Sequence, residues 1–351
     1  MFPNIVKILV ASLSTFVVGI LATPFLTKFL YAHELWKKTS VQKSLDGGAA
    51  TLTSALHNDE VRKTPRMGGI VVWGSVLIVA LGFMIMSFFV PSATLLKISF
   101  LSRNQTWLPL FTLIAASLVG LIDDYLVCRD RGGHVGGGLS LTKRLILVLI
   151  IAAIGAYWFY VKLGVSSIIV PFAGEISLGV LFIPIFIIVM IGMYSGGIID
   201  GVDGLAGGLF SIMFTSYGII AYYHTQFDLA AFAFAVAGGL LAFLWFNIPP
   251  ARFFLSETGT MGLTTTLVVI AFLTKAVVVL PIIALPLIVT SASSILQILS
   301  KKYRHGKKIF KIAPLHNHFQ AIGWPAYKVT MRYWIIGMML AIIGVVITLI
   351  G

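Results

Sequence analysis

Ten long apolar stretches constrain this chain more than any other feature. Each is about 20 residues long, the length that an α-helix needs to cross the hydrocarbon core of a bilayer, and none shows the alternation of barrel strands. Because only helices and closed barrels satisfy the backbone in lipid, the pattern predicts an all-α polytopic integral membrane protein, a single transmembrane domain over residues 1–351. The expected spans are 5–27, 68–90, 108–126, 144–162, 180–198, 204–223, 229–246, 261–279, 282–300 and 333–350.

Composition excludes a soluble globular domain. The chain is 58% hydrophobic and only 11% charged, whereas soluble domains carry about a quarter of charged residues. In a soluble protein the net charge of +13 would indicate nucleic acid; here it reflects membrane topology, and no nucleic-acid partner is expected. The single cysteine, Cys128, excludes an intramolecular disulfide. The first apolar stretch follows Pro3 without a small-residue cleavage site, so we interpret it as a retained span.

The distribution of charge predicts the orientation. By our count, 20 of the 25 Lys and Arg residues lie in alternate loops, on one side of the predicted membrane. The positive-inside rule puts that side in the cytoplasm and both termini outside. Ten of the 12 acids share the side, which concentrates polar chemistry there. On the other side, short β-prone runs around Pro171 and Gly174 predict a small hairpin over residues 165–178.

The adjacent carboxylates Asp123 and Asp124 close the third predicted span. A charge near hydrocarbon costs roughly 2.5–3.5 kcal/mol at the centre of a helix. Two neighbouring like charges also repel each other. The pair therefore indicates a cationic partner, either a metal or a positive substrate group. The alternative is a helix end whose acids are solvated at the headgroups.

Four further polar segments lie on the same predicted side. Basic residues and exposed backbone before the second span suit a phosphate. Two acids three residues apart between spans five and six can face one site, and glycines around them allow close approach of backbone to a ligand. The segments are Arg62–Gly69, Asp200–Gly208, Asn247–Gly259 and Pro314–Phe319, the last carrying His316 and His318.

The mixture of acids, histidines and cations favours one kind of metal chemistry. His and carboxylate can bind Zn or Fe, but His-x-His on a loop is a weak zinc signal without a third ligand nearby. With Arg and Lys around the acids, we expect Mg²⁺, held by carboxylates and by substrate phosphates. The reaction that fits is phosphoryl transfer at the membrane surface.

Taken in order, the five segments resemble the polyprenyl-phosphate hexose-1-phosphate transferase superfamily and, within it, the family of phospho-N-acetylmuramoyl-pentapeptide transferases. Residues Ala313–Phe319 are similar to that family's triple-histidine loop. The resemblance implies Mg²⁺-dependent transfer of phospho-MurNAc-pentapeptide from UDP-MurNAc-pentapeptide to undecaprenyl phosphate. The products would be lipid I, a peptidoglycan precursor, and UMP. It also implies a bacterial plasma membrane location, a cytoplasmic active site and a second copy of the chain as a candidate partner.

The resemblance also assigns roles to residues. It implies a metal ligand at Glu257. The implied catalytic residues are Asp123, Asp124, Asp203 and His316. The implied substrate-binding residues are Asn247, Phe254 and Gln297; the polar segments themselves add the candidates Arg62, Lys63, Arg144, Asp200 and His318.

The sequence departs from the family pattern at several of these positions. The family's Asn-Leu-Thr begins at Gly197 here, its Gly-Asp is Ser256-Glu257, its middle histidine is Asn317, and a family lysine is Val127. These changes bear on the nucleotide sugar and the rate more than on the reaction class. Three alternatives stay open: a sister transferase for another UDP-N-acetylhexosamine, a transporter with intramembrane acids, and an inactive relative with a binding role.

Overall fold

A computed structural model of the chain describes residues 2–37, 63–89, 98–102, 104–131 and 138–351. Within these ranges nine helices are long and apolar enough to cross a membrane, and a bent pair makes a tenth. The predicted all-α membrane fold is therefore confirmed. The nine are built on α1 (Phe2–Ala32), α3 (Gly69–Phe89), α5 (Trp107–Cys128), α6 (Leu141–Tyr157), α7 (Phe182–Tyr194), α8 (Leu205–Tyr223), α9 (Phe227–Asn247), α10 (Ser256–Leu273) and α14 (Ala326–Ile350).

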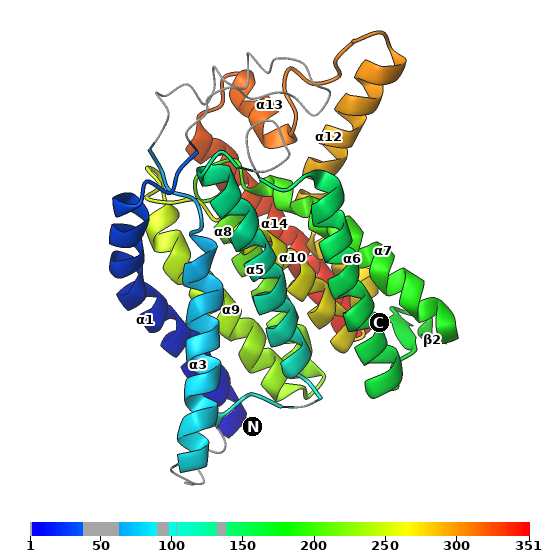
Figure 1. Cartoon of the computed structure of the whole chain (residues 1–351). Helices are drawn as coiled ribbons and strands as arrows, with labels where there is room; N and C mark the ends of the chain where they lie inside the picture. The colour runs from blue at the N-terminus through cyan, green and yellow to red at the C-terminus, as the bar shows by residue number, and fades with distance from the viewer. Residues whose placement is uncertain (1, 38–62, 90–97, 103, 132–137) are drawn as a thin grey trace.

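The bent pair occupies the ninth predicted span. It consists of a 3₁₀ turn and α11 (Leu280–Ile283), followed by α12 (Leu285–Tyr303), and the two parts meet at 71°. Pro286, at the start of α12, has no N–H to continue the helical ladder, which accounts for a break at this point. As a result α12 diverges from the bundle (Figure 1).

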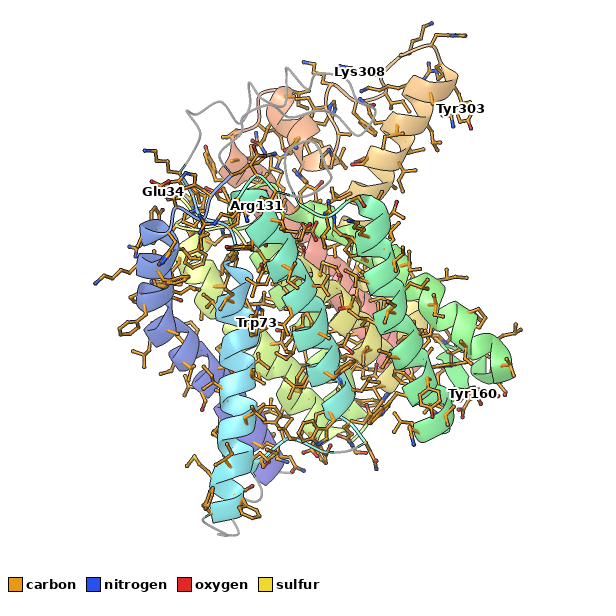
Figure 2. The ribbon with its side chains drawn as sticks, in the orientation of Figure 1. Glu34, Trp73, Arg131, Tyr160, Tyr303 and Lys308 are labelled. Atoms are coloured by element: carbon orange, nitrogen blue, oxygen red, sulfur yellow. The ribbon has the colours of Figure 1, made fainter. Side chains whose placement is uncertain are left out.

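The two ends of the bundle differ in character. Both termini lie toward one end, and the short helix α13 (Leu315–Ala321) lies at the opposite end (Figure 1). Figure 2 shows Glu34, Arg131 and Lys308 at the α13 end and Tyr160 toward the other. The described parts of the loops that carry Glu34, Arg131 and Lys308, which were predicted to share one side, therefore lie at one end of the molecule, which we call the α13 end.

The helix α10 is the central element. It packs against α3, α5, α7 and α8, and nearly all of its residues are buried. A Cβ at Gly120 would collide with the backbone of Glu257, so this glycine allows α5 to lie directly against the start of α10. Several threonine hydroxyls of α10 donate to carbonyls one turn earlier, as in Thr264 to Thr260 at 2.7 Å.

The predicted hairpin is present. Strands β1 (Ser167–Val170) and β2 (Gly174–Ser177) pair antiparallel, with Ile168 opposite Ile176. At its edge Lys275 Nζ donates to Glu175 at 2.6 Å, and this hydrogen bond, with a second from Ser167, lowers the pKa of the Glu175 carboxyl.

Several predicted boundaries were wrong: α1 ends at Ala32 and α10 at Leu273, where the spans were predicted to end at 27 and 279. The eighth and tenth spans were placed at 261 and 333, but their helices begin at Ser256 and Ala326. Their polar first turns were interpreted as loop, yet they remain helical because neighbouring loops supply partners, as where Ser256 N donates to Asp200. Residues 315–321 were also expected to be loop and form α13.

Candidate active site

The side chain of Asp124 is completely enclosed at the α13 end of α5. Its Oδ1 accepts from Arg66 Nε at 2.8 Å. Its Oδ2 accepts from the backbone N–H of Thr258 at 2.9 Å and from the Thr258 hydroxyl at 2.6 Å. Burial alone would lower the pKa of Arg66, but the facing Asp124 carboxylate raises it, so the guanidinium stays charged. The three donors hold the Asp124 side chain in place and connect three segments of the chain.

The Arg66 segment is held in place by backbone pairing. Gly68 N donates to Phe254 O at 2.8 Å, and Phe254 N donates to Pro65 O at 2.9 Å. This pairing positions Arg66 over Asp124 and sets Phe254, which is half-buried, at the edge of the site.

Asp123 faces a different neighbour from Asp124. Its Oδ1 accepts from the backbone N–H of Leu139 at 2.6 Å, and its Oδ2 lies 3.8 Å from Arg144 Nη1. Gly138 makes this approach possible: its φ is +88°, and a Cβ there would lie 3.0 Å from Asp123 Oδ1. The loop before α6 therefore wraps directly onto the first aspartate of the pair.

Glu257 completes this group from the first turn of α10. Its Oε1 accepts from Arg144 Nη1 at 2.8 Å. Arg144 thus lies between Asp123 and Glu257 and brings together two of the predicted acids. Thr260, one turn further along α10, is 3.5 Å from the other oxygen of Glu257.

The acids of the loop between α7 and α8 contact the segment that leads into α10. Asp200 Oδ2 accepts from Ser256 N at 2.6 Å, and Asp203 Oδ2 accepts from Ala251 N at 3.1 Å. Burial raises the pKa of Asp200 to about 6. Both acids therefore lie beside the segment that leads into α10 and Glu257.

The helix α13 covers the same loop. A Cβ at Gly201 would collide with the imidazole of His316, which is buried, so this histidine packs directly onto the backbone between Asp200 and Asp203. His318 lies further out, where its Nδ1 accepts from Lys311 N at 3.2 Å. The structure brings His316 to the acids and leaves His318 at the rim.

Two predicted substrate-binding residues hold loops in place. Asn247 Nδ2 donates to Phe253 O at 2.8 Å, and its Oδ1 accepts from Gly204 N at 2.9 Å. Gln297 makes three bonds to the backbone of residues 309 and 310. Lys63 is exposed at the start of its described segment, and Arg62 lies outside the described residues.

Sequence reasoning missed two residues of this site. Arg66 and Thr258 both bind Asp124, and neither was singled out as a site residue. The signal for Arg66 was a third cation in the segment before the second span. For Thr258 it was adjacency to Glu257.

The carboxylates of Asp123 and Glu257 are the candidate metal ligands of this site. Among the described residues, no group of three His, Cys, Asp or Glu side chains stands close enough to hold a metal ion. Asp123 and Glu257 nevertheless enclose one cationic group, the Arg144 guanidinium, with oxygen ligands of the kind that Mg²⁺ prefers. The residues therefore fit a divalent cation that takes its other ligands from water and substrate.

Fold and site together define a multi-pass membrane protein whose buried acids and arginines gather at one end of a helical bundle. The family model described as glycosyl transferase family 4 matches residues 106–275. The phospho-N-acetylmuramoyl-pentapeptide-transferases of Anoxybacillus flavithermus and Bacillus pumilus are 31% and 33% identical to the chain, each over 81% of it and 83% of the relative. The one from Chloroflexus aurantiacus is 28% identical over 99% of the chain and 91% of the relative.

These relatives establish the family. The chain belongs to the phospho-N-acetylmuramoyl-pentapeptide-transferase family, as the resemblance of its five segments predicted. It is thus a transferase of the bacterial membrane with multiple spans.

Proposed function

We propose that the protein transfers phospho-MurNAc-pentapeptide from UDP-MurNAc-pentapeptide to undecaprenyl phosphate, forming lipid I and releasing UMP. One observation carries the proposal: in a chain of this family, acids from α5 and α10 pair with two arginines at the α13 end, and the acids of the loop before α8 contact the segment that leads into α10. We place this end in the cytoplasm and both termini outside, from the excess of Lys and Arg in its loops.

The lipid phosphate needs orientation more than activation. The second pKa of a phosphate monoester is about 6, so near neutral pH it is already largely a dianion. Both oxygens of Asp124 are committed to Arg66 and Thr258. Asp123 is the less saturated of the two, since its Oδ2 has Arg144 only at 3.8 Å. We therefore assign Asp123 to orient the lipid phosphate for direct in-line attack on the β-phosphate.

The remaining residues position the nucleotide. Arg144 and the basic segment with Arg62 and Lys63 would neutralise the diphosphate. His316 would hold the diphosphate and steady the departing UMP, and Phe254 would stack on uracil. Asn247 and Gln297 would act through the loops that they hold.

A divalent cation would share this site. Glu257 and Asp123 are the residues that would hold Mg²⁺, since they already enclose one cation. When bound, Mg²⁺ supplies charge neutralisation for the diphosphate. Asp200 and Asp203 would position the loop that leads to Glu257.

The test is UMP release from the purified protein with undecaprenyl phosphate and each UDP-sugar in turn. We expect release with UDP-MurNAc-pentapeptide and none with UDP-N-acetylglucosamine. The reverse preference would identify the sister transferase, and no release with either would overturn the proposal. Glu257→Gln should abolish release with little loss of folded protein, whereas the exposed Lys143→Gln should not change it.

Two further outcomes bear on mechanism. Full turnover in excess chelator would exclude the divalent cation. A burst of UMP without lipid acceptor, or a sugar-phosphate trapped covalently on Asp123, would replace direct attack by a two-step route.

A further inference from the structure

The guanidinium of Arg144 lies between the carboxylates of Asp123 and Glu257 and is held by several contacts. Its Nη1 donates to Glu257 at 2.8 Å and lies 3.8 Å from Asp123. Its Nε donates to Leu139 O at 3.2 Å. Arg144 is thus built into the site and does not project freely toward solvent.

Among the ion pairs of the described residues, no other arginine contacts both Asp123 and Glu257. Arg66 pairs with Asp124, whose second oxygen is occupied by Thr258. Arg144 alone bridges Asp123 and Glu257 in that set. The positive charge between these two acids is therefore supplied by the protein itself.

A divalent cation and this guanidinium compete for the same oxygens. Mg²⁺ binds oxygen at about 2.0–2.1 Å and demands near-octahedral geometry, so it must displace an N–H donor that points at the same carboxylate. The two cations also repel each other at this distance. Among the described residues, no third acid, histidine or cysteine joins Asp123 and Glu257. The protein therefore supplies too few metal ligands to offset the loss of the Arg144 contacts.

A diphosphate changes this balance. Arginine binds phosphate oxygens through paired N–H donors as well as it binds carboxylate. A diphosphate beside Arg144 would therefore offer the guanidinium a new partner and release Glu257 and Asp123. Its oxygens would also complete the coordination of the metal.

We propose that Arg144 is an internal counter-cation that keeps divalent cations off the free protein, and that the diphosphate of the substrate draws it away. The metal and the nucleotide diphosphate then bind cooperatively, and neither binds tightly in the absence of the other. The inference rests on the proposed function in that it takes a diphosphate substrate at this site.

The experiment measures Mn²⁺ binding to the purified full chain by electron paramagnetic resonance, with and without UDP. UDP with Mn²⁺ in the absence of protein gives the reference. Without nucleotide, Arg144→Gln should bind Mn²⁺ at least about tenfold more tightly than wild type, the equivalent of 1.4 kcal/mol. The neighbouring Lys143→Gln is the matched control, and it should behave as wild type. Arg144→Lys, which keeps the charge, should stay within a few-fold of wild type.

Adding UDP should tighten Mn²⁺ binding to wild type by at least about tenfold, and to Arg144→Gln by much less. Equal Mn²⁺ affinity of Arg144→Gln and Lys143→Gln without UDP would overturn the proposal. So would wild type that binds Mn²⁺ equally well with and without UDP, a comparison that needs no variant to fold.

UMP release by the same wild-type preparation separates the two claims. Cooperative binding of UDP and Mn²⁺ without release would sustain this inference and overturn the proposed function. Release without cooperative binding would do the opposite.

Discussion

Replacing Arg66 by methionine should open the contact between its segment and α5. Asp124 is buried, Arg66 is only 27% exposed, and Nε to Oδ1 is 2.8 Å. Loss of one partner of a buried ion pair costs about 3–5 kcal/mol. Thr258 still donates twice to the carboxylate. We therefore expect a smaller loss, about 2–3 kcal/mol in the free energy of opening.

The single cysteine supplies the assay. Cys128 is buried and packs with Met67, one residue from Arg66. Its reaction with a thiol-specific dye under native conditions reports how often this contact opens. At tenfold per 1.4 kcal/mol, the labelling rate of Arg66→Met should rise about 30- to 150-fold.

A double-mutant cycle tests the cause. Asp124→Asn removes the charge that Arg66 neutralises, so the double variant Arg66→Met, Asp124→Asn should label more slowly than the product of the two single effects predicts. A labelling rate of Arg66→Met within about twofold of wild type would refute the ion-pair reasoning. So would purely multiplicative effects in the cycle.

Three other predictions concern single residues of the site. Asp200→Asn should flatten the pH dependence of thermal stability: since burial raises the pKa of Asp200 from about 4 to about 6, its contribution is full below pH 4 and is lost as the pH rises through 6. Ser256→Gly should raise the unfolding temperature, because Ser256 has a φ of 57°, and relief of a left-handed residue is worth up to about 1 kcal/mol. Gly138→Ala should lower UMP release at least about tenfold by displacing Asp123. Gly164→Ala, at a φ of +65° with nothing within 4 Å, is the control for backbone strain alone.

Much of the fold could be predicted because the membrane leaves few options. Apolar stretches of about 20 residues marked the spans, and β-prone runs beside Pro171 and Gly174 marked the hairpin. The 71° bend before α12 was not predicted, because its extent depends on neighbouring helices. The first turns of α10 and α14 were missed because polar residues there find partners in distant loops.

The site could be predicted by residue type but not by pairing. The acids were recognised because carboxylates at the end of an apolar helix need a partner. Which cation serves which acid depends on contacts between residues more than 50 positions apart, such as Arg66 with Asp124 and Arg144 with Glu257. The sequence also does not reveal that the side-chain amides of Asn247 and Gln297 are hydrogen-bonded to the backbone of nearby loops.

The burial of α10 has a consequence for how the chain is made. Its mean hydropathy, 1.2, is the lowest of the nine long helices in the described part of the chain, and 89% of its residues are buried. Threonines that would weaken its insertion as an isolated segment satisfy their hydroxyls within the helix. The four long helices that it packs against, α3, α5, α7 and α8, all precede it in the chain. We therefore expect α10 to enter the membrane late, against helices already assembled, so that a truncated chain ending after α10 but lacking α5 would fail to retain it in the bilayer.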